Sequence, residues 1–262
     1  MIDYLYTLIK ELCTKRDVLW QLVRQQLILR YRRTTLGYLW TLINPLLMMS
    51  VTAVVFATLF KVELKDYAVF LFAGMIPWNC FNATIGQSAV SFINNEGLIK
   101  KIYLPKIFFP LSVALAVLID SMLSFFVLFA IILCIGGQLS WSLLFIPFAY
   151  VLLFFFSFGV ALVASVATVF FRDLQYVIVI AMQAWFFLTP IMYKKNALTG
   201  SIAWLVQFNP VSTFIELFRN PLCFALLPSP SVIASAAALA IISLAFGLLV
   251  LARQEEKIVF RL

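Results

Sequence analysis

Long runs of apolar residues alternate with short polar breaks along most of the chain. Each run holds roughly the 20 mostly apolar residues that a helix needs to cross the hydrocarbon core of a bilayer. Only Arg172 and Asp173 separate the fourth run from the fifth, so a tight hairpin is expected there. The pattern therefore predicts an all-α membrane protein with six transmembrane helices, at residues 36–60, 68–92, 107–135, 143–171, 174–193 and 231–252.

Residues 194–230, between the fifth and sixth runs, depart from this pattern. The stretch is half apolar, and Asn209-Pro210 and Asn220-Pro221 interrupt it. Because proline removes a backbone donor and breaks a helix interior, one continuous span does not fit. We expect two short helices that dip into the membrane or lie on its surface, on the outer face.

The N-terminal arm, residues 1–35, shows a helical period in place of a continuous apolar run. Trp20, Val23, Leu27 and Tyr31 recur at helical spacing within residues 17–33, while polar side chains fall largely on other faces. A basic amphipathic helix just before a span is typical of the membrane interface. We predict an interface helix here, with a plain topology anchor as the alternative.

Composition supports the membrane class and adds an orientation. Apolar residues make up 64% of the chain and charged residues 11%, whereas soluble domains carry roughly 45–50% and about 25%. Fourteen of the 19 Lys and Arg residues lie in the arm, in the loop at residues 93–106, at Arg172 or in the tail at residues 253–262. The positive-inside rule therefore predicts both termini in the cytoplasm, with residues 36–252 as the transmembrane domain. The net charge of +8 then needs no nucleic acid partner.

The residues that catalysis or metal binding would need are scarce. The chain has no His, its four Cys residues form no CxxC pair, and the phosphate-binding pattern GxxxxGK[ST] is missing. We therefore expect no metal site and no cofactor in this chain. The sequence predicts a transport subunit and not an enzyme, so active transport would take its energy from a partner or an ion gradient.

Asp120 is the acidic residue deep in a predicted span. An intramembrane carboxylate is costly, which makes it a functional candidate by default. Ser121 and Ser124 flank it and could supply hydrogen bonds. Two interpretations stay open: an ion-coupled secondary transporter that uses Asp120, and an interhelical polar contact or an acid that lines a wet cavity.

The loop at residues 94–106 is short, basic and interleaved with apolar residues. Pro105 is expected to end a short helix in this loop before the next span. A solvated loop would not need its apolar side chains, whereas a helix that docks into a partner's groove would use them. They are Leu98, Ile99, Ile102, Tyr103 and Leu104. The alternative is an interfacial helix that rests on lipid.

Four stretches carry a resemblance to a known family. They are residues 32–40 with Asn44-Pro45, residues 72–79, residues 94–110, and residues 171–174 followed by 185–193, Asn209-Pro210 and 216–219. In this order they resemble the membrane (permease) subunit of a type 2 ABC exporter of cell-surface polysaccharides, the family of O-antigen, capsule and teichoic-acid exporters. The resemblance covers nearly the whole chain.

The resemblance implies a bacterial inner-membrane complex of two copies of this chain and two cytoplasmic ABC ATPase subunits, which bind ATP and Mg. The implied cargo is an undecaprenyl-diphosphate-linked polysaccharide, with O-antigen preferred and capsule or teichoic acid as alternatives. Six helices with small loops cannot enclose a wide hydrated pore, so we expect the glycan path between the two protomers.

The resemblance also suggests roles for particular residues. The ATPase-coupling helix would comprise Glu96, Gly97, Leu98, Ile99, Lys100 and Lys101. Arg30, Arg32 and Arg33 are candidates for holding the lipid diphosphate. Candidate sugar-stacking aromatics are Tyr38, Trp40, Trp78, Trp185 and Tyr193, with a membrane-interface belt as the alternative. Arg172 with Asp173, and Glu216 with Arg219, are expected to form structural polar pairs.

Overall fold

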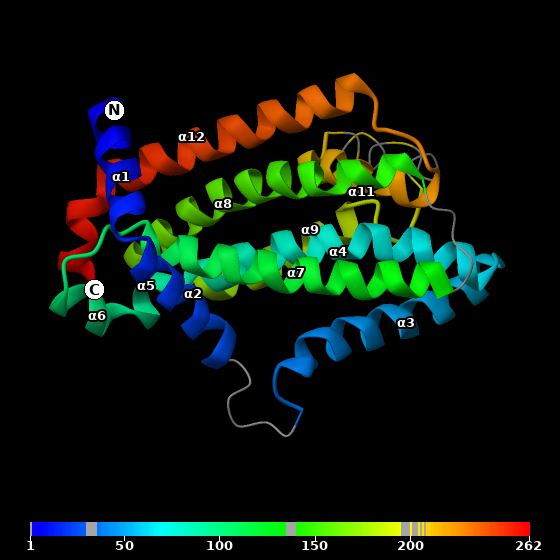
Figure 1. Ribbon diagram of the computed structural model, residues 1–262, viewed down its shortest axis with the longest axis horizontal. Helices are drawn as coiled ribbons and strands as arrows, with labels where there is room; N and C mark the ends of the chain where they lie inside the picture. Colours follow the sequence, from blue (N-terminus) through cyan, green and yellow to red (C-terminus); the bar gives the residue numbers. More distant parts are fainter. Residues whose placement is uncertain are drawn as a thin grey trace.

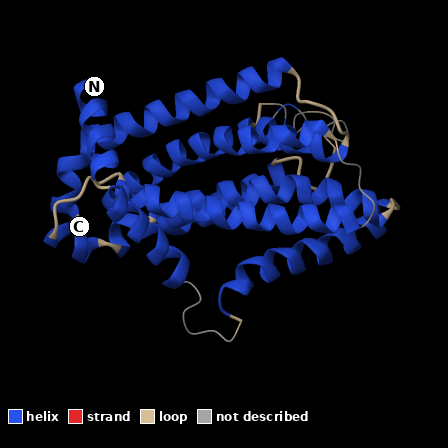
Figure 2. Cartoon of the chain, in the orientation of Figure 1, coloured by secondary structure: helices blue, strands red, loops and turns tan. Residues whose placement is uncertain are grey.

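The chain folds into a bundle of helices. A computed structural model describes residues 2–29, 36–134, 140–194, 200, 204, 206 and 208–262. Within these ranges the chain forms helices and loops and no strand (Figure 2). The prediction of an all-α fold is confirmed.

Five long helices run side by side along the long axis of the molecule (Figure 1). They are α3 (Trp40–Phe60), α4 (Leu64–Ala89), α7 (Phe108–Cys134), α8 (Ile146–Phe170) and α12 (Pro230–Arg261). All five are long and apolar enough to cross a membrane. They correspond to the first, second, third, fourth and sixth predicted spans. α12 continues nine residues beyond the predicted span end at residue 252, through most of the expected tail.

The fifth predicted span contains a shorter helix, α9 (Leu174–Leu188). Its 15 residues extend about 22 Å at 1.5 Å per residue. Thr189 is extended, as expected for a residue before proline, so the helix ends ahead of Pro190. The chain then continues to Met192, whose carbonyl oxygen accepts a hydrogen bond of 2.9 Å from the Tyr67 hydroxyl near the start of α4.

The bundle has two distinct ends, visible in Figure 1. The termini end holds both chain ends, α1 (Ile2–Thr14), α2 (Arg16–Leu29), α5 (Ser91–Asn94) and α6 (Glu96–Lys101). The opposite end, here called the α11 end, holds the α3–α4 turn and α11 (Pro210–Cys223). Of the two short helices expected within residues 194–230, α11 is described, and most of residues 195–207 lie outside the described residues.

α11 begins where the sequence pattern predicts and ends later than it predicts. Asn209-Pro210 marks its start as expected, since Pro210 occupies the first turn, where its missing N–H costs nothing. The expected break at Asn220-Pro221 is wrong, because the helix runs through Pro221 to Cys223. Pro221 removes the single bond that a backbone N–H at this position would make to the Leu217 carbonyl oxygen, and the helix ends two residues later. Phe214 and Phe218 are fully buried against the bundle.

The N-terminal arm folds onto the termini end. α2 packs against α7 and covers the predicted interface helix as far as Leu29. Leu22 and Val23 are buried, whereas Trp20 is 60% exposed. Val23 of the predicted stripe therefore packs on the bundle while Trp20 of the same stripe faces away from it, and the placement of this helix in the membrane interface stays a prediction. A separate hydrophobic cluster joins Leu8 and Leu22 to Ile99 of α6 and to Ile258 of α12.

α8 and α12 approach each other through small residues. A Cβ placed on Gly247 would lie 2.4 Å from the Gly159 carbonyl oxygen, and one on Gly159 would lie 2.3 Å from the Ser243 backbone. The Ser243 hydroxyl donates to the Phe156 carbonyl oxygen at 2.9 Å. Small residues let transmembrane backbones pack closely where lipid supplies no hydrophobic driving force.

Candidate functional site

The predicted coupling loop forms the short helix α6 at the termini end. The Lys100 ammonium lies 2.6 Å from a Glu96 carboxylate oxygen on the preceding turn. This hydrogen bond and its charge lower the pKa of Glu96, and the charge of Arg172 adds to the effect. Arg172 lies in the turn between α8 and α9, so that turn belongs to the same end of the bundle as α6.

The apolar residues of this loop divide into two groups. Ile99 and Leu104 are buried within the subunit, so they anchor the loop. Ile102 and Tyr103 are 52% and 77% exposed, and Lys101 is also exposed. α6 ends at Lys101, before the expected Pro105, because Ile102 adopts an extended backbone. Gly97 and Lys100 of α6 are exposed as well, so the surface that a partner could contact includes one side of the helix and extends beyond it.

The arm contacts this exposed surface. The Lys15 ammonium, between α1 and α2, lies 5.0 Å from the centre of the Tyr103 ring. Such a cation–π contact contributes about 0.5–1 kcal/mol at an exposed site. A partner that displaces Tyr103 would therefore also act on the N-terminal arm.

Asn209 joins α11 to the end of α9. Its side-chain oxygen accepts hydrogen bonds from the Val211 N–H at 3.0 Å, capping α11, and from the Trp185 indole N–H at 3.1 Å. Its amide nitrogen donates to the Thr189 hydroxyl at 2.8 Å and to the Leu188 carbonyl oxygen at 3.2 Å. One buried side chain thus fixes the entry of α11 and the exit of α9.

Arg219, near the other end of α11, makes a second junction with the segment after α9. Its guanidinium donates to the carbonyl oxygens of Pro190 and Ile191, and lies 3.8 Å from the centre of the Phe70 ring. Gly74 leaves the space, because a Cβ there would lie 2.8 Å from the guanidinium. Arg219 is 7% exposed. Glu216, its predicted partner, lies one turn earlier on α11 and is half-buried.

The predicted aromatic residues occupy different environments. Trp78 is 3% exposed and packs against Phe81 and Phe186 with ring centres 5.9 and 5.6 Å apart, so it lies inside the subunit. Trp185 is half-buried with its N–H on Asn209. Tyr193 is half-buried, and its hydroxyl donates to the Phe187 carbonyl oxygen. Trp40 is 39% exposed, and the side chain of Tyr38 lies outside the described residues.

The predicted lipid-binding arginines and the predicted pair Arg172–Asp173 lie in different parts of the chain. Arg30, Arg32 and Arg33 lie outside the described residues. Arg172 and Asp173 are both exposed in the turn between α8 and α9. Among the residues that the structure describes, no group of three or more His, Cys, Asp or Glu side chains could hold a metal ion.

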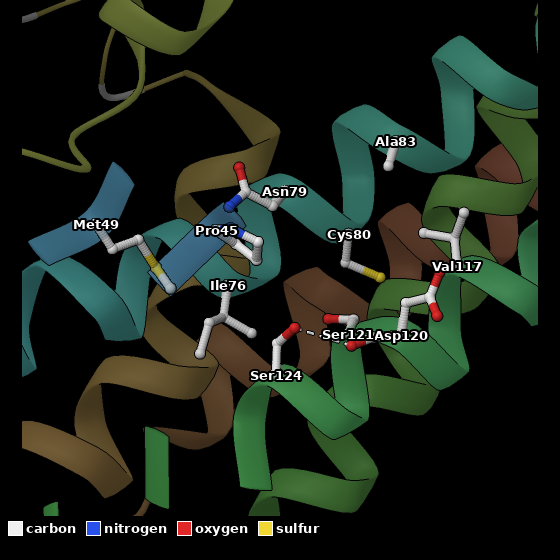
Figure 3. A pocket seen from close by; sticks show the side chains of 10 residues that line it. All are labelled: Pro45, Met49, Ile76, Asn79, Cys80, Ala83, Val117, Asp120, Ser121 and Ser124. Carbon is white, nitrogen blue, oxygen red and sulfur yellow. Dashed lines mark hydrogen bonds between the residues drawn. The ribbon is translucent and has the colours of Figure 1, made fainter. Parts of the chain in front are cut away.

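Asp120 lines a pocket of about 150 Å³ between α3, α4 and α7 (Figure 3). Asp120 is 7% exposed, and the Ser124 hydroxyl donates to its backbone carbonyl oxygen at 2.9 Å. The Ser121 hydroxyl lies 3.2 Å from the Tyr150 hydroxyl. Asn79 and Cys80 of α4 complete the polar lining. Sequence reasoning missed these two residues, because only the packing of α4 against α7 brings them to Asp120.

Five helices of spanning length, a short apolar sixth and two differently built ends define a multi-pass membrane protein. A family model for the ABC-2 type transporter matches residues 17–222, and the chain belongs to that family. The family supplies the transmembrane permease component of ABC transporters in the inner membrane.

Similar proteins with curated names agree with this assignment. An O-antigen export system permease protein RfbA of Klebsiella pneumoniae is 31% identical over 209 residues, which are 78% of this chain and 81% of that one. The RfbA protein of Myxococcus xanthus is 27% identical over 81% of this chain and 82% of its own length. The polysialic acid transport protein KpsM of Escherichia coli is 24% identical over 73% and 75%.

Proposed function

We propose that this chain is the permease subunit of an exporter that moves undecaprenyl-diphosphate-linked polysaccharide, O-antigen in particular, across the bacterial cytoplasmic membrane. The observation that carries the proposal is the likeness to O-antigen export permeases over about four fifths of both chains. Export of a capsule polymer is the second candidate, favoured by the weaker likeness to a polysialic acid transport protein. A teichoic-acid exporter belongs to the same family of candidates.

We infer six membrane crossings with both termini in the cytoplasm. α9 starts beside Arg172, whose charge acts on Glu96 at the termini end. The segment after α9 reaches Tyr67 at the α11 end, so residues 174–192 pass from one end to the other. The described cationic residues of α1, α2, α6, the α8–α9 turn and the end of α12 gather at the termini end, as the positive-inside rule requires of the cytoplasmic side.

Two separate ATPase subunits would drive export by pressing on the α6 loop. Its exposed residues run from Lys100 to Tyr103, with Gly97 one turn earlier. Ile99 fixes the loop to the hydrophobic cluster that also includes residues of the arm and the end of α12. Because interiors are close-packed, displacement of a loop held in this way shifts the elements packed against it. ATP and Mg belong to those partner subunits in this proposal.

The glycan path would lie between two copies of the chain. α4 packs at the centre of the subunit, where 67% of its most apolar stretch is buried. The corresponding windows of α3 and α12 are only 17% buried, so these helices offer faces to lipid or to a second copy. The diphosphate head would enter near the arm, where Arg30, Arg32 and Arg33 are the candidate cations.

Deletion of the gene in its own host tests the proposal. Lipid-linked glycan is expected to accumulate in the cytoplasmic leaflet while the surface loses one polymer, and plasmid-borne copies of this chain and its ATPase should restore export. The chemistry of the accumulated polymer separates O-antigen from capsule and teichoic acid. Unchanged surface glycans, with no lipid-linked intermediate, would overturn the assignment to polysaccharide export.

A further inference from the structure

An apolar groove of about 390 Å³ lies between α4, α8, α9 and α12. Its lining is apolar apart from the Ser243 hydroxyl and the indole N–H of Trp185. Both polar groups are already paired, because Ser243 donates to Phe156 and the Trp185 N–H donates to Asn209. A cavity of about 150 Å³ with an apolar lining binds benzene, so this larger groove offers room for a hydrocarbon chain.

The groove has the length and direction of one lipid leaflet. Its α9 lining runs from Leu174 to Trp185, which is about 16 Å along a helix. One leaflet of a hydrocarbon core of about 30 Å is about 15 Å thick. Ala164 and Ala167 on α8 and Ala181 on α9 form the trough, because their short side chains leave space that larger residues would fill. Trp185 closes the groove toward the middle of the bundle.

The Leu174 end of the groove lies beside cations. Leu174 follows Arg172 by two residues, and the Arg261 guanidinium lies 5.9 Å from the centre of the Phe170 ring at the end of α8. Arg253 lies two turns after the groove residue Phe246 on the same face of α12. All three arginines are exposed, and Asp173 is the acidic residue in the same turn as Arg172.

We propose that this groove holds one acyl chain of a phospholipid with an anionic headgroup, from the leaflet on the side of the chain's termini. The apolar trough receives the acyl chain, and Arg172 and Arg261 meet the headgroup phosphate. Arginine binds the phosphate of either lipid class through several N–H donors at once. A zwitterionic headgroup also carries a cation that the arginines repel, so the net charge favours the anionic lipid. The proposal does not depend on the exported cargo, because binding needs only this chain and lipid.

Native mass spectrometry of the purified chain with phosphatidylglycerol or phosphatidylcholine of the same acyl chains tests the proposal. The wild-type chain is expected to retain phosphatidylglycerol preferentially. Ala181→Leu fills the groove and should abolish this retention, whereas Ala184→Leu, an exposed change on α9 outside the groove lining, should leave it intact. Arg172→Gln and Arg261→Gln should each lower retention by about fivefold.

Four outcomes would overturn the proposal. Equal retention of both lipids removes the headgroup site, and wild-type retention by Ala181→Leu removes the groove as the acyl site. If equimolar polyprenyl phosphate displaces phosphatidylglycerol, the groove belongs to the cargo lipid. If Ala181→Leu abolishes dimers of the chain but keeps the bound lipid, the groove belongs to a second copy. Photo-crosslinking of diazirine-labelled phosphatidylglycerol to peptides of α8 and α9 gives a readout on the unmodified chain.

Discussion

Arg219 is a single side chain that holds two elements together. It satisfies the carbonyl oxygens of Pro190 and Ile191, in a segment where proline prevents helical bonding. Replacement by Gln, which reaches less far, should leave these groups unsatisfied and cost about 1–3 kcal/mol. We expect Arg219→Gln to lower the melting temperature of the purified chain and to reduce export in cells.

The matched control for Arg219 is Arg253→Gln, which changes an exposed arginine of α12. This variant should keep the wild-type melting temperature. Arg219→Lys adds a sharper comparison, because one ammonium cannot present the planar, multi-donor geometry of a guanidinium to both carbonyl oxygens. If Arg219→Lys or Arg219→Gln proved as stable as Arg253→Gln, the junction would not depend on this side chain.

Gly247 permits the close approach of α8 and α12. A methyl group there would meet the Gly159 backbone at 2.4 Å, and backbone cannot move aside cheaply. Gly247→Ala is expected to destabilise the chain by about 1–3 kcal/mol, the usual cost of overpacking. Thermal unfolding in detergent measures the effect against Gly86→Ala, whose Cβ would meet nothing within 4 Å. Equal melting curves for the two variants would contradict the packing argument.

A substitution at Asp120 distinguishes the proposed exporter from an ion-coupled carrier. Asp120 is buried in the pocket between α3, α4 and α7, and a carrier would need its charge to change during transport. The Asn side chain keeps the shape and polarity of the site. In the ATP-driven exporter we expect Asp120→Asn to retain near-normal export, measured as surface polysaccharide in complemented cells. Abolished export by a well-folded variant would favour the carrier.

At the scale of elements, sequence patterns succeeded where one physical effect dominates. Continuous apolar runs located five helices of spanning length, because length and hydropathy alone decide whether a helix can cross a bilayer. The pattern could not show that α9 ends at Leu188, since the apolar run continues past the backbone restriction that Pro190 imposes. Nor could it show that α12 stays helical to Arg261, where the buried Ile258 packs at the termini end.

The candidate sites were less predictable than the helices. The α6 loop was found because apolar residues in a basic loop are unusual, yet the pattern could not separate the buried Ile99 from the exposed Ile102. Arg219 was expected to pair with Glu216 on its own helix, and its bonds to Pro190 and Ile191 depend on a contact 28 to 29 residues away in sequence. Such long-range contacts leave no local periodicity to read.

The α6 loop should carry the coupling to the ATPase through its exposed part. Tyr103 is 77% exposed and lies against Lys15, so Tyr103→Ala removes a large contact surface without opening the core. Exposed aromatics often carry much of the binding energy of an interface, about 2 kcal/mol or more. We expect Tyr103→Ala to keep normal expression but to reduce export and the ATP hydrolysis of the reconstituted complex.

Phe260→Ala is the control for Tyr103→Ala, because Phe260 is 88% exposed on α12 at the same end of the bundle. The control should hydrolyse ATP at the wild-type rate. Full hydrolysis and export by Tyr103→Ala would place the ATPase contact elsewhere, whereas a deficit shared equally by both variants would indicate a general surface effect.

At the scale of the whole molecule, the number of crossings decides which end faces which compartment. If residues 174–192 cross the membrane, Leu227 lies outside and α12 returns the C-terminus to the cytoplasm. If α9 only dips, Leu227 lies inside and the C-terminus emerges outside. Both positions suit labelling, since Leu227 is 66% exposed and Phe260 is 88% exposed.

Single-cysteine labelling with a membrane-impermeant maleimide distinguishes the two topologies. Starting from a chain with its four native cysteines replaced, Leu227→Cys and Glu63→Cys should react in intact spheroplasts, because both lie at the α11 end. Phe260→Cys, and Cys13 retained alone, should react only after the membrane is opened. Labelling of Phe260→Cys in intact spheroplasts, with Leu227→Cys protected, would mean five crossings, and then the two chain ends could not both meet a cytoplasmic motor.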